Sequence, residues 1–304
     1  MSGTRLEARL TTALPVELLT TLRPLVASQH DPTIRIRAAG FVRAAQTPNG
    51  PGTIVAARQP DRSFQVQGHG PGARWLLDRV GGLLGTEDRL AGFRPTAHPT
   101  VARAHHRQPG LRMLRTGTVV DVLVPTIIAQ RVTSLEAARS WTRLVRHLGS
   151  AAPGPFQLLV PPDPARLCRV PAAVFHGLGI ERARARRIVD ACRHVDELDA
   201  ALALPPAQRL ARWLAVPGVG PWTAAHLARV AAGDTDAVEV GDHNTKHLVA
   251  WNLAGEPRGT DERMLALLSP FAGHRGRVVR LLGTAGQPPP RYGPRHRLHP
   301  VEHL

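Results

Sequence analysis

The sequence predicts an α+β protein, because extended and helical patterns occupy different parts of the chain. Short runs rich in β-branched residues, bounded by Gly, Pro and Asn, are confined to residues 34–67. From residue 73 onward apolar residues recur at helical spacing, and no convincing strand pattern appears. A hydrophobic content of 43% and a charged content of 20% support a buried core, so we expect a folded chain.

The N-terminal region is expected to be mixed in structure. Residues 15–25 predict a short helix, because Val and Leu return there at helical spacing. Two turn-rich segments, residues 47–52 and 59–62, interrupt the extended runs. The expected strands are residues 34–36, 41–45, 53–57 and 64–67.

The remainder of the chain is expected to be helical. A first helix at residues 73–84 ends at Gly85, a favourable residue just past a helix end. Further helices are expected at residues 117–129, 134–148, 181–194, 206–214, 222–231, 245–253, 262–268 and 276–282. We therefore divide the chain into a mixed domain at 1–80, a helical domain at 81–286 and a basic tail rich in Pro, Arg and His at 287–304.

Charge is the first indication of function. The net charge is +16 and Lys246 is the only lysine, so nearly all of the positive charge is arginine. Such a chain attracts a polyanion, and arginine binds phosphate through two hydrogen bonds, although a compositional bias of the genome would produce the same count. No apolar run is long enough for a membrane span, and residues 1–9 lack the apolar core of a signal peptide, so we expect a cytoplasmic protein associated with the nucleoid through DNA.

Several other classes of site are disfavoured by the residue counts. Two cysteines cannot build a disulfide framework or a cysteine-ligated cluster, and we interpret them as ordinary thiols. The fifteen histidines show no zinc-ligand spacing. No dinucleotide or nucleotide phosphate-loop motif is present either.

The segment Leu-Ala-Val-Pro-Gly-Val-Gly-Pro-Trp-Thr-Ala, residues 214–224, is a glycine turn between two expected helices. Gly218 and Gly220 carry no Cβ, so the backbone N–H groups at the start of the second helix can approach a phosphate closely. Such contacts hold DNA without reading its sequence. The alternative is an ordinary helix–helix turn that uses glycine for its left-handed residue.

Asp242 lies twenty-two residues after Gly220 and directly precedes a helical pattern. The simplest interpretation of Asp242 is a helix N-cap. A catalytic role is compatible with capping, because amide donors and the helix dipole stabilise a carboxylate at that position. A carboxylate beside a developing sugar cation is what the removal of a base requires.

The hairpin and its spacing to Asp242 resemble the helix-hairpin-helix DNA glycosylase superfamily, most closely the bacterial 3-methyladenine DNA glycosylase II type. The resemblance runs from about residue 75 to 295, and the N-terminal third agrees only in layout, with that type's small antiparallel domain. Segments that match in order are residues 83–93, 109–115, 127–134, 177–180 and 270–277.

The resemblance assigns the catalytic aspartate to Asp242. It places phosphate-binding backbone at Gly218, Val219 and Gly220, and a further DNA contact at Thr223. In the superfamily the hairpin carbonyls commonly also hold a cation. Trp222 occupies the position where members with lyase activity carry a nucleophilic lysine, and an indole forms no Schiff base. The resemblance therefore implies hydrolysis by water, without strand cleavage.

The base pocket is expected to include Trp222, whose indole face suits a cationic base, and His226 one turn later. The alternatives are a packed core tryptophan and a structural histidine. The resemblance assigns DNA contacts to Gln130 and Arg131, with Arg131 at the position of the wedge that fills the gap in the duplex. Arginine replaces the apolar residue expected there, so it can pair with the orphaned base or contact phosphate instead.

Together these features predict a monofunctional DNA glycosylase. It would hydrolyse the N-glycosidic bond of alkylated, cationic purines in damaged double-stranded DNA and so initiate base excision repair, as a monomer without a cofactor. Two alternatives remain from the same residues. One is an oxidised-purine glycosylase, which the absence of lysine near Trp222 disfavours, and the other is a helix-hairpin-helix DNA-binding protein without catalysis.

Overall fold

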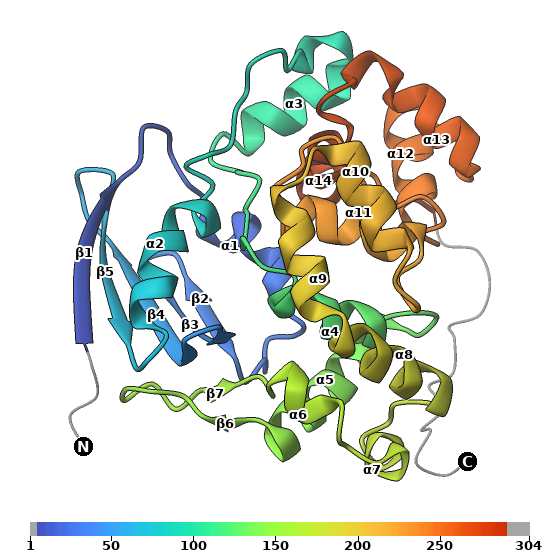
Figure 1. Ribbon diagram of the computed structural model, residues 1–304. Helices are drawn as coiled ribbons and strands as arrows, with labels where there is room; N and C mark the ends of the chain where they lie inside the picture. The colour runs from blue at the N-terminus through green and yellow to red at the C-terminus, as the bar shows by residue number, and fades with distance from the viewer. Residues whose placement is uncertain (1–4, 291–304) are drawn as a thin grey trace.

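The computed structural model describes residues 5–290, and most of the basic tail predicted at 287–304 lies outside these residues. A five-stranded antiparallel sheet forms the N-terminal part, with strand order β1-β5-β4-β3-β2, and helices form the rest (Figure 1). The α+β class is therefore confirmed. The strands are β1 Arg5–Thr11, β2 Ile34–Arg37, β3 Gly40–Thr47, β4 Gly50–Arg58 and β5 Ser63–His69.

One face of the sheet is covered by α2 (Ala73–Leu83), which packs against β1, β4 and β5. Two glycines allow this close approach. A Cβ on Gly52 would lie 2.7 Å from Leu76 Cδ1, and one on Gly68 would lie 2.9 Å from the Ala73 carbonyl oxygen. Side chains of any size at these positions would push the helix off the sheet.

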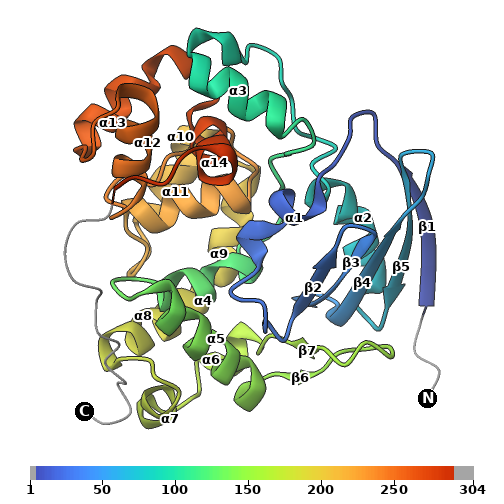
Figure 2. The same ribbon diagram turned by 180° about the vertical axis from the view of Figure 1, so that it is seen from behind.

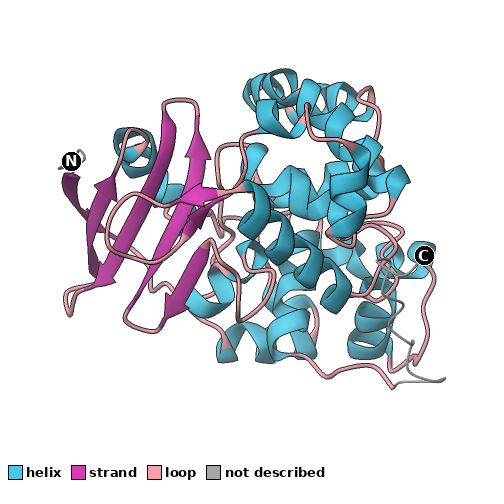
Figure 3. Ribbon diagram, turned by 90° about the horizontal axis from the view of Figure 1, so that it is seen from below, coloured by secondary structure: helices cyan, strands magenta, loops and turns pink. Residues whose placement is uncertain are grey.

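The helical part follows the predicted order. Its principal helices are α3 Pro99–Arg107, α4 Val120–Ile128, α5 Ser134–Leu148, α7 Ala172–Gly177, α8 Arg182–Arg193, α9 Val195–Ala200, α10 Pro206–Leu214, α11 Pro221–Val230, α12 Thr245–Ala254, α13 Asp261–Leu268 and α14 Arg275–Ala285. The views from behind and from below show the sheet on one side of the molecule and the helices on the other (Figures 2 and 3).

Two apolar cores organise these helices. The larger core is continuous from the inner face of the sheet through α4, α5 and α8 to α11. A second core joins α3, α12, α13 and α14. Figure 2 shows these four helices grouped together, away from the sheet.

Several sequence predictions of local structure were wrong. The expected helix at 15–25 is limited to α1 (Leu18–Thr21) and a 3₁₀ turn at Arg23–Leu25, because Pro24 lacks the N–H that would continue the helix. Part of the turn predicted at 47–52 is strand, since β4 begins at Gly50. Elements not predicted are β1, α3, α6 (Pro164–Leu167), α7, α9 and a short hairpin of β6 (Ser150–Ala151) and β7 (Leu159–Val160).

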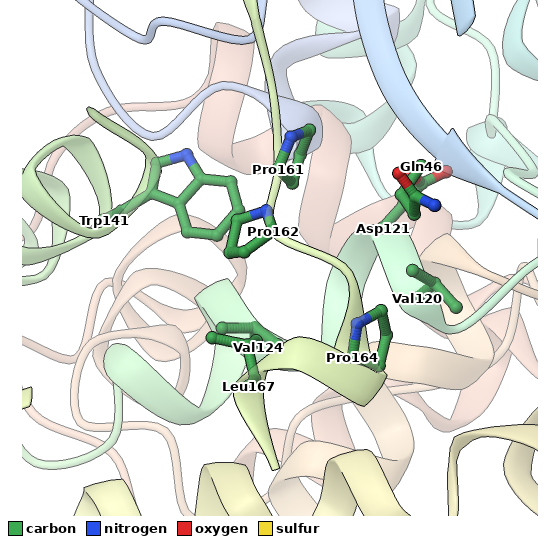
Figure 4. A pocket seen from close by; sticks show the side chains of 9 residues that line it. All are labelled: Gln46, Val120, Asp121, Val124, Trp141, Pro161, Pro162, Pro164 and Leu167. Carbon is green, nitrogen blue, oxygen red and sulfur yellow. The ribbon is translucent and has the colours of Figure 1, made fainter. Parts of the chain in front are cut away.

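A buried ion pair connects the sheet to the helices. Arg43 of β3 contacts Asp121 of α4 at 2.6 Å, with side-chain exposures of only 7% and 2%. Beside Asp121 lies a cavity of ≈ 10 Å³, shown from close by in Figure 4. This volume admits about one water molecule, so the cavity is too small for a substrate. The residues that line it are Gln46, Val120, Asp121, Val124, Trp141, Pro161, Pro162, Pro164 and Leu167.

Candidate functional site

The glycine turn connects α10 to α11, as predicted, and its two glycines differ in conformation. Gly218 has φ +89°, and a Cβ there would lie 3.1 Å from Arg187 Cβ of α8. Gly220 has φ −83°, and a Cβ would meet nothing within 4 Å. Pro221 begins α11 at the position where its missing N–H costs nothing. The open space at Gly220 leaves the start of α11 accessible to a ligand.

Val219 and Thr223 support the turn from inside. Each residue as a whole, backbone included, is buried, with exposures of 3% and 1%, so neither presents a surface for the predicted DNA contact in this structure. Gln130 lies at the end of α4, and its Nε2 donates to Thr223 Oγ1 at 3.0 Å and to the Gly218 carbonyl at 3.4 Å. Its Oε1 accepts from Arg187 at 3.4 Å. Gln130 therefore holds the hairpin against α4 and α8.

The cation predicted at the hairpin would be held by backbone carbonyls. The Gly218 carbonyl accepts from Gln130 Nε2 at 3.4 Å, and the Val216 carbonyl accepts from the Val219 N–H at 3.1 Å. Each of these oxygens has a second lone pair, so the cation stays a prediction.

Arg131 follows Gln130 and is exposed. Its backbone has φ +57°, a left-handed conformation that is uncommon for a residue other than glycine. The chain then enters α5 through a capping box, in which Thr133 and Glu136 satisfy each other's backbone N–H groups. The turn between two well-anchored helices thus presents Arg131 outward, close in sequence to a residue that contacts the hairpin.

Asp242 lies beside α11, two residues before the next helix's N-cap, which is Asn244 rather than the predicted Asp242, but its side chain accepts from the first N–H groups of that helix. Its Oδ1 accepts from the Asn244 N–H at 2.9 Å, and from the Thr245 N–H and Oγ1 at 2.8 Å each. Its Oδ2 accepts from Trp222 Nε1 at 3.3 Å. The carboxylate is therefore fixed at one oxygen by the start of α12 and linked at the other to the first turn of α11.

Trp222 and His226 lie on the face of α11 next to this carboxylate. Their rings are nearly parallel, with an interplanar angle of 14° and centroids 5.8 Å apart. Neither side chain belongs to the fully buried core, and both are intermediate in exposure. Trp222, His226 and Asp242, which the sequence analysis placed in one site, lie in contact in a chain from one to the next.

No family model matches the sequence, and no curated protein matches it. Solved structures do. A 3-methyladenine DNA glycosylase from Archaeoglobus fulgidus superposes with a TM-score of 0.75 at 16% identity, covering 90% of this chain and 97% of that one. The chain has the helix-hairpin-helix DNA glycosylase fold.

Two further glycosylase structures support this assignment. An 8-oxoguanine glycosylase/lyase from Clostridium acetobutylicum, in complex with double-stranded DNA, gives a TM-score of 0.69 at 12% identity over 93% of this chain and 97% of that one. A 3-methyladenine DNA glycosylase from Schizosaccharomyces pombe, bound to abasic DNA, gives 0.52 at 14% identity over 64% and 94%. Identities this low establish the glycosylase fold, and the activity must be argued from the site.

Behind Trp222 the glycosylase fold contains a charged group that the sequence analysis missed. We call it the Glu239 cluster: Glu239, Arg229, His226 and Arg280. Glu239 Oε1 accepts from Arg229 Nε at 2.7 Å and lies 3.0 Å from His226 Nδ1. Arg280 of α14 donates to the Thr20 carbonyl and interacts electrostatically with Arg229 and Glu239.

Burial and charge set the protonation of this cluster. Burial would raise the pKa of Glu239, but Arg229 and His226 outweigh it and hold that pKa well below its ordinary value. Burial lowers the pKa of His226, the hydrogen bond to Glu239 raises it, and the nearby Arg229 lowers it again, so that the net shift is downward. Burial lowers the pKa of Arg280 to about 9, with Arg229 contributing. The cluster therefore contains an ionised Glu239 and a neutral His226.

The only lysine is connected to the backbone beside Asp242 through Asp261, whose Oδ1 accepts from the Gly241 N–H at 3.1 Å. Lys246 Nζ is 3.4 Å from Asp261 Oδ2, and both side chains are about one-quarter exposed. This ion pair joins the first turn of α12 to the first turn of α13. Lys246 therefore has an ionic partner on the side of α12 that contacts α13.

Within residues 5–290 no helix combines the length and apolar composition that crossing a bilayer requires.

Proposed function

We propose that this protein is a monofunctional DNA glycosylase that removes alkylated, cationic purines from double-stranded DNA. The observation that carries the proposal is the hydrogen bond between the Asp242 carboxylate and the Trp222 indole. It joins the candidate catalytic carboxylate to the first turn of α11, in a chain with a glycosylase fold. The hairpin would hold the phosphate backbone while the damaged nucleotide lies beside Asp242.

The chemistry begins with eversion of the damaged nucleotide from the stack, at a cost of about a few kcal/mol. The C1′–N bond then breaks, and its electron pair leaves with the base. An alkylated purine already carries a positive charge, so it departs as a neutral molecule without a proton donor. The deoxyribose becomes an oxocarbenium-like cation, which the negative charge of Asp242 stabilises.

Water completes the reaction. Its oxygen bonds to C1′ and its proton is released, which leaves an abasic site in an intact strand. The side chain at position 222 is an indole, and the only lysine is paired with Asp261. The proposal therefore includes no Schiff base between an amine of the protein and the sugar. Strand cleavage is therefore not part of the proposed activity.

Base release from a methylated duplex tests the proposal, with Asp242→Asn as the main variant. Asparagine can accept the same hydrogen bonds from Asn244 and Thr245 at Oδ1, but it carries no charge, and its amide nitrogen cannot accept from Trp222 Nε1. At an effective dielectric constant of about 20, a carboxylate about 4 Å from a unit positive charge contributes roughly 4 kcal/mol. We therefore expect base release to slow by about 10³-fold.

Two further measurements separate the alternatives. Asp242→Asn should bind a duplex containing an abasic-site analogue as tightly as the unmodified protein, because the hairpin is unchanged. Borohydride should trap no covalent protein–DNA adduct. An unmodified protein that binds DNA but releases no base from any lesion would indicate a non-catalytic binding protein, and a trapped adduct would overturn the monofunctional mechanism.

A further inference from the structure

His226 has one ring nitrogen that no neighbour uses. Its Nδ1 lies in the Glu239 cluster, whereas Nε2 has no hydrogen-bond partner among residues 5–290. Nε2 is also absent from the buried side-chain atoms that lack a partner, so it retains contact with solvent. The side chain as a whole is 20% exposed. A half-buried histidine with one free nitrogen next to the candidate catalytic residues is suited to contact a ligand.

The Glu239 cluster determines whether this nitrogen donates or accepts. Glu239 is ionised and accepts hydrogen bonds only, so the short contact with His226 Nδ1 requires a proton on Nδ1. Arg229 Nη2 lies 3.1 Å from Nδ1 and 2.5 Å from the same Glu239 oxygen, so one of its two N–H groups is directed to the carboxylate, and a proton on Nδ1 avoids two acceptors facing each other across the 3.0 Å contact with Glu239. Because the imidazole is neutral, a proton on Nδ1 leaves a lone pair on Nε2. Nε2 is therefore a hydrogen-bond acceptor.

The position of the ring aims this acceptor toward the site. Glu239 is 6% exposed, and Arg229 has a side-chain exposure of 11%, so the Nδ1 edge of the ring faces the interior. The exposed part of the ring is then the edge that contains Nε2. The ring also lies nearly parallel to Trp222, whose indole N–H donates to Asp242. A base whose sugar lies beside Asp242 would meet Trp222 and then His226.

We propose that His226 Nε2 accepts a hydrogen bond from the exocyclic amino group of an everted 6-aminopurine, and that Glu239 is the positioning residue that fixes this tautomer. The inference rests on the proposed glycosylase function and names the class of base within it. Adenine derivatives present an amino donor at C6. Guanine and hypoxanthine derivatives present an oxygen there, which would face the lone pair of Nε2 unfavourably.

Two lesions test this inference, each in the same duplex: 7-methyladenine, with an amino group at C6, and 7-methylhypoxanthine, with an oxygen at C6 and a hydrogen on N1. Both carry the same methyl group, and each enzymatic rate is divided by the spontaneous rate of base loss from the same lesion, so the comparison reports on the C6–N1 edge. Single-turnover base release should be about 10-fold faster for 7-methyladenine, the effect of one hydrogen bond to a buried polar group. Equal rates in the unmodified protein would overturn the inference while leaving the glycosylase function intact, and release of neither base would instead contradict the proposed function.

Two variants identify the residues responsible. His226→Phe keeps a flat ring but removes Nε2, so the rate ratio should fall to about one. Glu239→Gln offers an amide donor to Nδ1 as well as an acceptor, which allows the other tautomer and should reduce or invert the ratio. Exposed His30 provides the matched control, and His30→Phe should retain the full preference. A purely structural role for His226 would slow both bases equally, so an unchanged ratio in His226→Phe would refute the proposal.

Discussion

The α10–α11 turn contains two glycines, and replacing each with alanine distinguishes an effect on stability from an effect on DNA binding. Gly218→Ala places a Cβ at φ +89°, 3.1 Å from Arg187 Cβ. A side chain in the left-handed region costs about 1–2 kcal/mol. The reduced freedom of the unfolded chain returns about 0.4–1 kcal/mol. We therefore expect the free energy of unfolding to fall by about 1 kcal/mol, or more where Arg187 must shift.

Gly220→Ala is the matched partner, because alanine fits its φ of −83° and meets no atom within 4 Å. Gly220 is the N-cap of α11, a position where alanine is less favourable than glycine. This loss is roughly balanced by the same unfolded-state gain of about 0.4–1 kcal/mol. Stability should hence stay within about 0.5 kcal/mol of the unmodified protein, the usual range for a benign substitution. The added methyl group nevertheless occupies the space that a phosphate would need.

Thermal unfolding and binding to a duplex with an abasic-site analogue, both at one salt concentration, measure the two effects. Gly218→Ala should lower Tm by about 2–4 °C and weaken binding. Gly220→Ala should leave Tm unchanged and raise Kd by about 10-fold or more, as expected for a lost charge-assisted hydrogen bond. Gly92, with φ +80° and open space around it, is the control for strain alone. Normal DNA binding by Gly220→Ala would refute the phosphate-binding role of the hairpin.

Three further outcomes are expected. Arg131→Ala should slow excision to a degree that depends on the base opposite the lesion, without a change in Tm, because the side chain is exposed; an equal loss on duplexes with each of the four opposing bases would indicate a phosphate contact instead. Arg277→Met should lower the free energy of unfolding by about 3–5 kcal/mol, read from urea titration, because it leaves the fully buried Asp88 carboxylate without its partner; a loss below about 1 kcal/mol would be inconsistent with that ion pair. Stability should also decrease as the pH falls below the ordinary histidine pKa of 6.5, because burial lowers the pKa of His226 in the folded state and the unfolded chain then binds more protons. His226→Phe should flatten this part of the stability curve, and an identical pH dependence in the variant would contradict it.

Helices with strong local signals were predictable from the sequence. The bounds predicted for α5 and α10 coincide with the structure, since a capping box at Thr133 begins one and a proline at Pro206 begins the other. Weakly patterned elements were missed. In α3 only Val101 and Ala104 are buried, and three basic residues occupy its last turn. Its packing comes from α12–α14, far along the chain, so its own sequence does not indicate a helix.

The same distinction holds for the candidate site. The glycine turn and Asp242 are recognisable because each lies at a helix start with its own local signature. The Glu239 cluster has none. Glu239 lies in a loop, ten and thirteen residues from its two partners, which also show no periodic relation to it. Only the folded backbone brings these charges together, so a single sequence gives no sign of them.

The ion pair between Arg43 and Asp121 has a consequence for dissecting this protein. Asp121 belongs to α4, the helix that leads to Gln130 and Arg131, and its partner is supplied by the sheet. In a fragment lacking the first seventy residues, the buried Asp121 carboxylate would have no ion-pair partner. The same helix would also lose the apolar side chains of the sheet that pack against it. The sheet therefore stabilises the helical part of the molecule and is not an independent unit. Truncation experiments that aim for a shorter folded protein should therefore keep the sheet.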